Sequence, residues 1–296
     1  MLTRIITAIV ALCVFVPICI FSDTIVLEIA MAVLNAVAVW EIWHCITGDD
    51  REDKSRTIGS FWLYLPVVLA SAGLVFMPRI FSWSADPLVI DNAFLANKNA
   101  MYLVFMTFFC LMLYIFAVVV FSRGKIAITN AAVMLMMSLY VTTAFVSILC
   151  LRGDPNGAAL FLLPFIGSWV SDTFAYFTGR LLGKHKLIPE VSPKKTVEGA
   201  IGGVVFTAIG FVVFGLIVRE GNAAPNFVML AVSGAVVSVI SQIGDLIASV
   251  VKRHYGIKDY GKLFPGHGGV LDRFDSVMAT APVLYMLIRM FPNLFM

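Results

Sequence analysis

Long apolar runs separated by short polar stretches form the main pattern of this sequence. A helix that spans a bilayer needs about 20 mostly apolar residues, because no water satisfies its backbone inside the hydrocarbon. Nine segments meet this requirement and predict an all-α polytopic membrane protein, with spans near residues 5–21, 25–46, 58–77, 101–121, 126–151, 158–176, 200–218, 227–247 and 270–291. The first segment has no small-residue cleavage site after it, so we interpret it as a retained helix rather than a signal peptide.

The composition agrees with this class. Hydrophobic residues make up 60% of the chain and charged residues only 13%, and the mean hydropathy is +0.94. The net charge of +3 is too small to indicate a nucleic-acid binder. The 5 cysteines form no CxxC pair and have no histidine at ligand spacing, which argues against a disulfide framework or a zinc site.

The basic residues predict the orientation of the chain in the membrane. Nine spans place the two termini on opposite sides, so the lysines and arginines of the two sides can be compared. About three quarters of the 21 fall on the side of the N-terminus, beginning with Arg4 and continuing with Arg51, Lys54 and Arg56 in the loop after the second span. We therefore expect a cytoplasmic N-terminus.

Ionisable residues suggest two regions with different roles. Residues 1–157 contain the first five spans and few ionisable residues, which is typical of a scaffold with a lipid-facing or dimer surface. Residues 158–296 contain four spans with acids at the helix ends and basic loops between them, so we expect the chemistry there. Glycines along the seventh span indicate close helix packing, namely Gly199, Gly202, Gly203, Gly210 and Gly215.

Four aspartates fall at the predicted ends of the last spans: Asp172, Asp245, Asp272 and Asp275. A carboxylate in a membrane costs a few kcal/mol, so each one requires a partner, a cavity or a metal. On the predicted topology all four lie at cytoplasmic helix ends and can meet at one depth. A structural salt bridge explains any one of them equally well, but the four together beside two basic loops favour a functional site.

The first basic loop predicts the start of a helix. Ser192 would be the N-cap and Pro193 the first helical residue, with Lys194 and Lys195 beside the exposed N–H groups and Glu198 in the first turn. Such a helix start attracts phosphate. The second basic loop carries Lys252, Arg253, Lys258 and Lys262 before a glycine-rich turn at residues 265–269, where backbone N–H groups can approach an anion. Carboxylates for a divalent cation and lysines for phosphates indicate phosphoryl or nucleotidyl transfer.

The second loop and the helix after it carry a longer motif, formed by Ser249, Val250, Val251, Lys252, Arg253, Lys258, Asp259, Gly261, Phe264, Pro265, His267, Gly268, Gly269, Val270, Asp272, Arg273, Phe274 and Asp275. This motif resembles the signature of the phosphatidate cytidylyltransferase family, the CDP-diacylglycerol synthases. Residues 192–199 and 172–176 resemble that family as well. The resemblance covers about residues 169–276, whereas the first five spans resemble the family only in hydropathy.

The resemblance implies a multi-pass enzyme of the cell inner membrane, with its active site on the cytoplasmic side. It would join CTP and phosphatidate into CDP-diacylglycerol and pyrophosphate, use Mg²⁺ with room for a second cation, and form a homodimer. We expect Asp245 and Asp272, with Asp275 close by, to hold Mg²⁺, and Asp172 to be a further metal ligand or lysine partner. The phosphate clamps are expected among Lys194, Lys195, Lys252, Arg253 and Lys258.

The remaining motif residues are expected to bind substrate, and these are Asp259, Gly268, Gly269, Arg273, Ser192 and Glu198. His267 is either a proton donor to pyrophosphate or a residue whose hydrogen bond orders the loop. Two other functions stay open. An ion-coupled transporter also places polar residues within a helix bundle, although the predicted acids gather at one face here. A CTP-dependent lipid kinase would use the same site to transfer the γ-phosphate.

Overall fold

The computed structural model describes residues 2–48, 60–82, 97–154, 156–218 and 226–291. Seven helices in these ranges are long and apolar enough to cross a membrane, which confirms the all-α polytopic class. The chain divides into two compact units, Met1–Pro155 with Tyr255–Arg273 and Asn156–His254 with Phe274–Met296, which we call the first unit and the second unit. The long loop before the last helix therefore belongs with the N-terminal helices.

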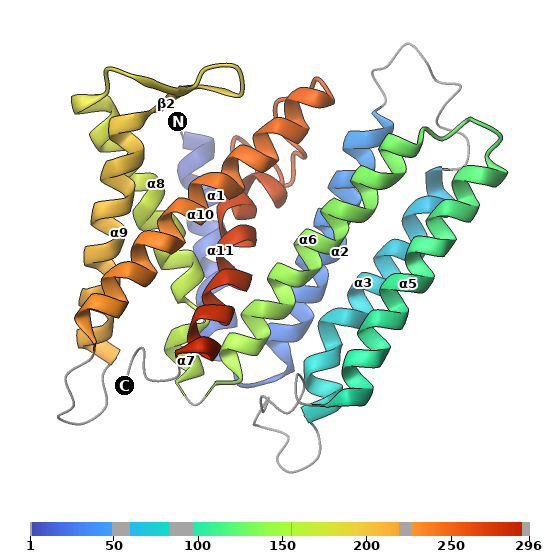
Figure 1. Ribbon diagram of the computed structural model, residues 1–296, viewed down its shortest axis with the longest axis horizontal. Coiled ribbons are helices and arrows are strands. Elements are labelled where there is room, and N and C mark those ends of the chain that lie inside the picture. The colour runs from blue at the N-terminus through green and yellow to red at the C-terminus, as the bar shows by residue number, and fades with distance from the viewer. Residues whose placement is uncertain (1, 49–59, 83–96, 155, 219–225, 292–296) are drawn as a thin grey trace. The chain divides into compact units, whose positions relative to one another are not determined.

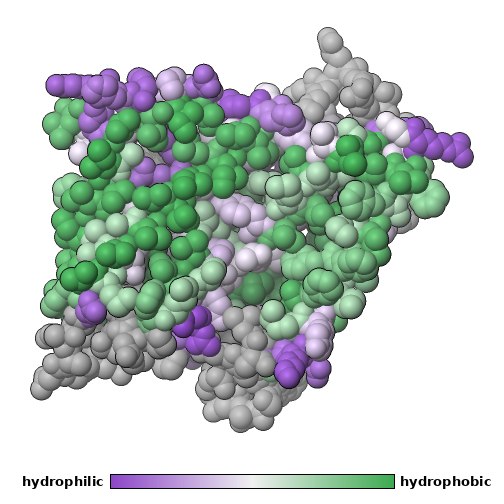
Figure 2. Space-filling view, viewed as in Figure 1, coloured by the Kyte–Doolittle hydropathy of each residue, from purple (hydrophilic) through white to green (hydrophobic). Residues whose placement is uncertain are grey.

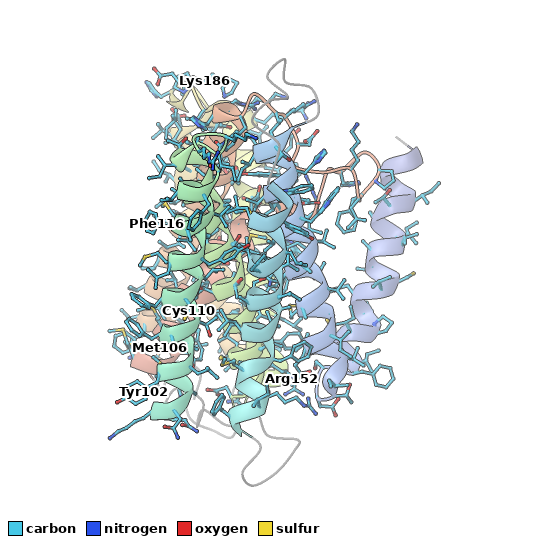
Figure 3. The ribbon with its side chains drawn as sticks, turned by 90° about the vertical axis from the view of Figure 1, so that its right-hand side faces the viewer. Tyr102, Met106, Cys110, Phe116, Arg152 and Lys186 are labelled. Atoms are coloured by element: carbon cyan, nitrogen blue, oxygen red, sulfur yellow. The ribbon has the colours of Figure 1, made fainter. Side chains whose placement is uncertain are left out.

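The first unit is a bundle of long helices (Figure 1), formed by α1 (Leu2–Ile20), α2 (Ile25–Thr47), α3 (Ser60–Ser82), α5 (Lys98–Phe121) and α6 (Ile128–Arg152). Helices α2, α3 and α6 pack against one another, while α5 packs on α3 and α6 and α1 packs on α2. Tyr102, Met106, Cys110 and Phe116 project from α5 away from its neighbours (Figure 3). An apolar face of this kind suits contact with lipid.

Two arginines of the first unit are paired with polar side chains of other helices or loops. Arg79 donates to Glu28 at 2.6 Å, and Arg152 donates to Ser22 at 2.9 Å. These residues lie where α2 begins and where α3 and α6 end, so they gather at one end of the bundle. Pairing the charges lowers the cost of placing them beside apolar helices.

The second unit contains α7 (Gly157–Leu160), α8 (Leu163–Leu182), β1 (Lys186–Ile188), β2 (Ser192–Thr196), α9 (Val197–Val218), α10 (Phe227–His254) and most of α11 (Leu271–Met290). Helices α8, α9 and α10 pack together, and β1 pairs with β2 as an antiparallel hairpin. Hydrophobic side chains cover the visible flank of these helices, and hydrophilic ones gather at the hairpin (Figure 2).

Close approach of α8 and α9 depends on glycine, as predicted. A Cβ atom at Gly199 would lie 2.6 Å from the carbonyl oxygen of Ala175, and one at Gly203 would lie 3.1 Å from that of Ser171. Gly202 and Gly215 have similarly close neighbours, whereas a Cβ at Gly210 would meet nothing nearer than 3.7 Å. The packing role is therefore confirmed for four of the five glycines.

The predicted spans coincide with helices, with corrections at their ends. α8 and α10 continue to Leu182 and His254, so Asp172 and Asp245 lie inside helices and not at their ends, and Lys252 and Arg253 lie in the last turn of α10. The α1 residues Ile6–Ile20 form a shorter apolar helix, and α11 is not among the seven candidate spans, so the count of nine stays a prediction. Arg51, Lys54 and Arg56 lie outside the described residues.

Candidate active site

A pocket of about 350 Å³, with charged side chains in a largely apolar wall, lies in the second unit among α8, the hairpin, α9 and α10. We call it the hairpin pocket. It is lined by Asp172, Ala175, Tyr176, Gly179, Arg180, Leu187, Lys194, Lys195, Thr196, Gly199, Ala200, Gln242 and Asp245. The structure thus brings together two predicted phosphate-binding lysines and two predicted metal-binding aspartates.

Lys195 and Asp245 form an ion pair across this pocket. Their side chains are 25% and 28% exposed, so the pair is open to solvent on one side. The same lysine approaches the carbonyl oxygen of Gln242 at 3.5 Å, and the Gln242 side chain donates to the carbonyl oxygen of Ala200 at 3.1 Å. A lysine on β2 and a carboxylate on α10 are therefore in direct contact in this pocket.

Asp275 extends this set of charges. Its side chain lies within electrostatic range of Asp245, Lys252 and Asp172. Ser276 links two of these acids, because its N–H donates to Asp275 at 2.8 Å and its hydroxyl donates to Asp172 at 3.4 Å. Three of the four predicted aspartates therefore meet within the second unit. Lys252 is nearly buried, at 9% exposure, so its charge acts in a poorly solvated place.

The hairpin replaces the helix start predicted at Ser192. Residues Ser192–Thr196 form β2, and α9 begins at Val197. Thr196 is the capping residue, because its hydroxyl accepts the N–H of Gly199 at 3.1 Å. The prediction failed because Ser192 and Pro193 fit an edge strand as well as a helix start, and Thr196 has the same capping chemistry nearer the apolar run.

Ser192 and Glu198 do not line the hairpin pocket. Glu198 instead accepts the backbone N–H groups of Lys184 and His185 at 3.1 and 3.2 Å, and it pairs with His185 Nδ1 at 2.6 Å. Its carboxylate ties the end of α8 to the start of α9. In the structure, Glu198 therefore stabilises the start of the hairpin.

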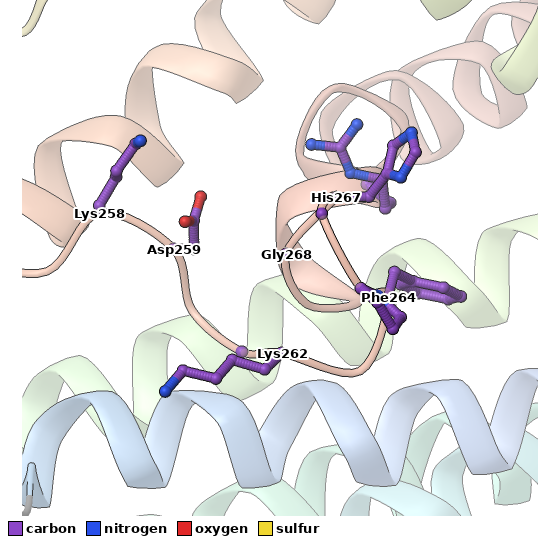
Figure 4. A pocket seen from close by; sticks show the side chains of 10 residues that line it. Lys258, Asp259, Lys262, Phe264, His267 and Gly268 are labelled. Atoms are coloured by element: carbon purple, nitrogen blue, oxygen red, sulfur yellow. The ribbon is translucent and has the colours of Figure 1, made fainter. Parts of the chain in front are cut away.

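A second pocket, of about 450 Å³, lies in the first unit (Figure 4). We call it the loop pocket. It is lined by Lys258, Asp259, Gly261, Lys262, Phe264, Pro265, Gly266, His267, Gly268 and Arg273. Three permanent cations face one carboxylate in this set, so the pocket suits an anion. The structure brings Lys258, Asp259, His267, Gly268 and Arg273 together as the motif predicts.

The glycine-rich turn gives the loop pocket a fixed shape. Phe264 and Gly268 exchange backbone hydrogen bonds of 2.8 and 3.0 Å. The turn is possible because Gly266 and Gly268 adopt φ angles of 76° and 92°, which side-chain-bearing residues rarely adopt. His267 Nδ1 is buried without a hydrogen-bond partner among the described residues, so this atom does not order the loop.

Two carboxylates hold the end of this loop where α11 begins. Oδ2 of Asp272 accepts the N–H groups of Tyr260 and Gly269 at 2.8 and 2.9 Å. Glu41 of α2 accepts the N–H groups of Val270 and Leu271 at 2.8 and 2.9 Å. Asp272 is a predicted metal ligand, but in the structure its Oδ2 atom accepts two backbone N–H groups and so holds the loop.

The sequence analysis did not single out Glu41, although the signal was present. It is an acid in the middle of an apolar predicted span, and such a group requires a partner. Arg180 of the hairpin pocket carried no comparable signal, because a single basic residue near a helix end is common.

The donor set fits Mg²⁺ bound together with phosphates. Among the described residues, no group of three or more His, Cys, Asp and Glu side chains is arranged to hold a metal ion. Mg²⁺ commonly takes only one or two protein carboxylates and completes its shell with water and substrate phosphates. Asp245 and Asp275, which interact electrostatically, supply carboxylates of this kind.

Comparison with known proteins extends the similarity to the whole chain. The model of the cytidylyltransferase family matches residues 2–291. A phosphatidate cytidylyltransferase from Staphylococcus haemolyticus is 33% identical over 97% of this chain and 99% of its own. Proteins of the same name from Staphylococcus saprophyticus and Staphylococcus aureus are 34% and 33% identical over the same shares of both chains. The similarity therefore includes the N-terminal helices as well as the motif.

Proposed function

The chain belongs to the cytidylyltransferase family, and from this premise we propose how its two pockets serve the transfer of cytidylate from CTP to phosphatidate. The activity is that of a phosphatidate cytidylyltransferase, a CTP-using nucleotidyltransferase that makes CDP-diacylglycerol. The observation that carries the proposed mechanism is the ion pair between Lys195 and Asp245 beside Asp172 in the hairpin pocket.

The reaction needs little proton transfer. A phosphate oxygen of phosphatidate attacks the α-phosphorus of CTP, and the bond from that phosphorus to the bridging oxygen of the β-phosphate breaks. Pyrophosphate leaves with the electron pair of that bond. The attacking oxygen is already anionic at neutral pH, so no strong general base is required. Catalysis then consists mainly of positioning the two phosphates and neutralising their charge.

The hairpin pocket supplies both signs of charge for this task. Lys194 and Lys195 suit phosphate oxygens, and Lys195 exchanges its contact with Asp245 for substrate when CTP binds. Asp245 is then available to a cation. The nearly buried Lys252 offsets the negative charge of Asp275 in the same unit.

We assign Asp245 and Asp275 to Mg²⁺, with Asp172 beside them. Asp272 belongs to the first unit, where its Oδ1 atom stays a separate candidate for a cation. Bound Mg²⁺ supplies charge neutralisation at the triphosphate and at the leaving pyrophosphate. The chain itself orients these carboxylates through Ser276, which donates to both Asp275 and Asp172.

The loop pocket is proposed to hold phosphate as well. Lys258, Lys262 and Arg273 supply positive charge, and His267 has an unpaired buried ring nitrogen that suits a phosphate oxygen. Phosphate oxygens of CTP and of phosphatidate have the same chemistry, so either substrate fits. Binding measurements with each substrate alone, on variants of Lys194 and Lys262, separate the two assignments.

The finer topology is part of the same proposal. We place nine spans in the cell inner membrane, with the N-terminus and both pockets at the cytoplasmic side where CTP is available. The seven apolar helices and the excess of basic residues on that side support this placement. The homodimer is proposed from the family resemblance.

The direct test is a purified-protein assay with omission controls. We expect pyrophosphate and a cytidine-linked lipid to form in equal amounts only when CTP, phosphatidate and Mg²⁺ are all present. Pyrophosphate formed without phosphatidate, or lipid product formed in the presence of a magnesium chelator, would contradict the proposed mechanism.

A further inference from the structure

Glu41 is a fully buried acid, 0% exposed, near the end of α2. Each of its two carboxylate oxygens accepts a different backbone hydrogen bond. Oε1 accepts the N–H of Val270 at 2.8 Å, and Oε2 accepts the N–H of Leu271 at 2.9 Å. These are residues 229 and 230 positions further along the chain. A helix of the N-terminal bundle therefore holds the point where the motif loop ends and α11 begins.

This position requires a carboxylate. The first N–H groups of a helix have no partner within the helix, and a negative charge at that end is favoured by the helix dipole. The N–H groups of Val270 and Leu271 each meet a different oxygen of Glu41, so a glutamine in the same place would turn its NH₂ group, a donor, toward one of them. One of them would face another donor in a buried place, which is costly.

Two glycines of the motif pack so closely against Glu41 that a side chain at either position would clash with it. A Cβ atom at Gly261 would lie 2.9 Å from the carboxyl carbon of Glu41, and one at Gly269 would lie 2.5 Å from it. Both distances are closer than real Cβ contacts. The loop therefore has no side chain where it passes the buried acid on either side of the turn. The motif and Glu41 fit each other across a long separation in the sequence.

Two more contacts from the N-terminal helices reach the same loop. Tyr255 donates its hydroxyl to Asn130 of α6 at 3.1 Å, and Thr7 of α1 donates to the carbonyl oxygen of Pro265 at 3.0 Å. Asp272 accepts the N–H groups of Tyr260 and Gly269 from within the loop. Glu41 combines full burial with two hydrogen bonds to the loop from a helix outside it. It is thus the main fixed point of the loop pocket.

We infer that Glu41 is a positioning residue for the reaction, holding the phosphate-binding loop 258–273 in its working shape from a helix outside the signature motif. The inference rests on the proposed function of the loop pocket. It also gives the N-terminal bundle a part in catalysis beyond anchoring the chain, because the acid acts through the backbone of Val270 and Leu271 and not by touching substrate.

The test compares Glu41→Gln with Glu28→Gln in the full-length protein in detergent. Glu28 is a matched control, since it is a buried glutamate of the same helix, 1% exposed, and it accepts a hydrogen bond from Arg79 and not from the loop. Amide hydrogen exchange is followed in a peptide covering residues 259–273, together with kcat and KM for CTP and phosphatidate. A third variant, Glu41→Asp, keeps the charge on a shorter side chain.

We expect Glu41→Gln to speed exchange in this peptide about tenfold or more and to lower kcat/KM by about tenfold, whereas Glu28→Gln changes neither by more than about twofold. Glu41→Asp should recover part of the lost kcat/KM. The inference is overturned if Glu41→Gln keeps wild-type exchange in the loop, or if both glutamine variants lose activity equally and in step with their melting temperatures.

The same experiment separates this inference from the proposed function. A wild-type protein that makes no CDP-diacylglycerol defeats the proposed function, and the exchange contrast between Glu41→Gln and Glu28→Gln still decides whether Glu41 holds the loop. An active wild type with no exchange contrast defeats the inference alone.

Discussion

Asp245 has a charged partner in the hairpin pocket, because Lys195 contacts it directly. Both side chains are about a quarter exposed, so solvent screens their attraction and the pair contributes at most about 1 kcal/mol to stability. The pair is therefore better explained by function than by folding. Loss of either charge should affect turnover far more than it affects unfolding.

Asp245→Asn should lower kcat at least about 100-fold, equivalent to about 2.7 kcal/mol of transition-state free energy. The substitution removes the charge that we assign to Mg²⁺ and hardly changes the volume of the side chain. Glu190→Gln is the control, since Glu190 is an exposed acid of the same hairpin that does not line the pocket. Activity is measured over a magnesium titration. Near-normal turnover of Asp245→Asn would move the assignment to Asp275 or Asp172.

Lys194 and Lys195 allow a phosphate clamp to be distinguished from a membrane anchor. Lysine is a compact point donor and arginine a planar fork, so an anchor tolerates the exchange and a tight clamp does not. We expect Lys194→Arg or Lys195→Arg to lose about tenfold or more in kcat/KM, roughly 1.4 kcal/mol. Lys186→Arg, in the exposed strand β1, should behave as wild type. The measurement is steady-state kinetics in detergent with both substrates saturable. If Lys194→Arg and Lys195→Arg both keep the kcat/KM of the Lys186→Arg control, the phosphate clamp is contradicted.

The helices of this chain were largely predictable, and the connections between them were not. Runs such as residues 25–46 and 227–247 predicted helices because backbone in a membrane has few alternatives. Hydropathy could not place the ends of α8 and α10, since both helices continue through polar residues after the apolar run stops. The strand at Ser192 depends on pairing with β1, and such pairing carries no signal in a five-residue segment.

The candidate site was predictable to a similar degree. Individual site residues stood out because aspartates and lysines are rare in this chain and each requires an explanation. Their partners did not stand out. The contact of Lys195 with Asp245 and the hold of Glu41 on Val270 depend on helices that meet only after folding. Composition and periodicity carry no information on such pairs.

The α8–α9 contact gives a prediction at the level of the element. Gly199→Ala should destabilise the protein and reduce activity, because its Cβ atom would lie 2.6 Å from a backbone oxygen of Ala175, and Gly199 lines the hairpin pocket. Overpacking of this kind costs about 1–3 kcal/mol. Gly210→Ala in the same helix has room and should be neutral or slightly stabilising. Melting temperatures in detergent test this, and equal values for the two variants would contradict the packing account.

The topology of the whole molecule can be tested by labelling single cysteines in a background without the 5 native cysteines. We expect cysteines at Asp53 and Lys186 to react from the cytoplasmic side, and cysteines at Asn92 and Asn222 to react from the opposite side. Asp53, Asn92 and Asn222 lie outside the described residues. The expectation follows from nine spans and the distribution of basic residues. Reaction of the last two positions only from the cytoplasm would exclude the nine-span topology.

The central claim for the molecule is that it transfers the cytidylyl group of CTP to phosphatidate. CTP labelled at the α-phosphate or at the γ-phosphate tests this most directly, because the two phosphates have different fates. The account predicts that the α-label appears in the lipid and the γ-label in pyrophosphate, with both signals lost in Asp245→Asn. A γ-label in the lipid would indicate a lipid kinase, and no turnover of either label would contradict the enzymatic account altogether.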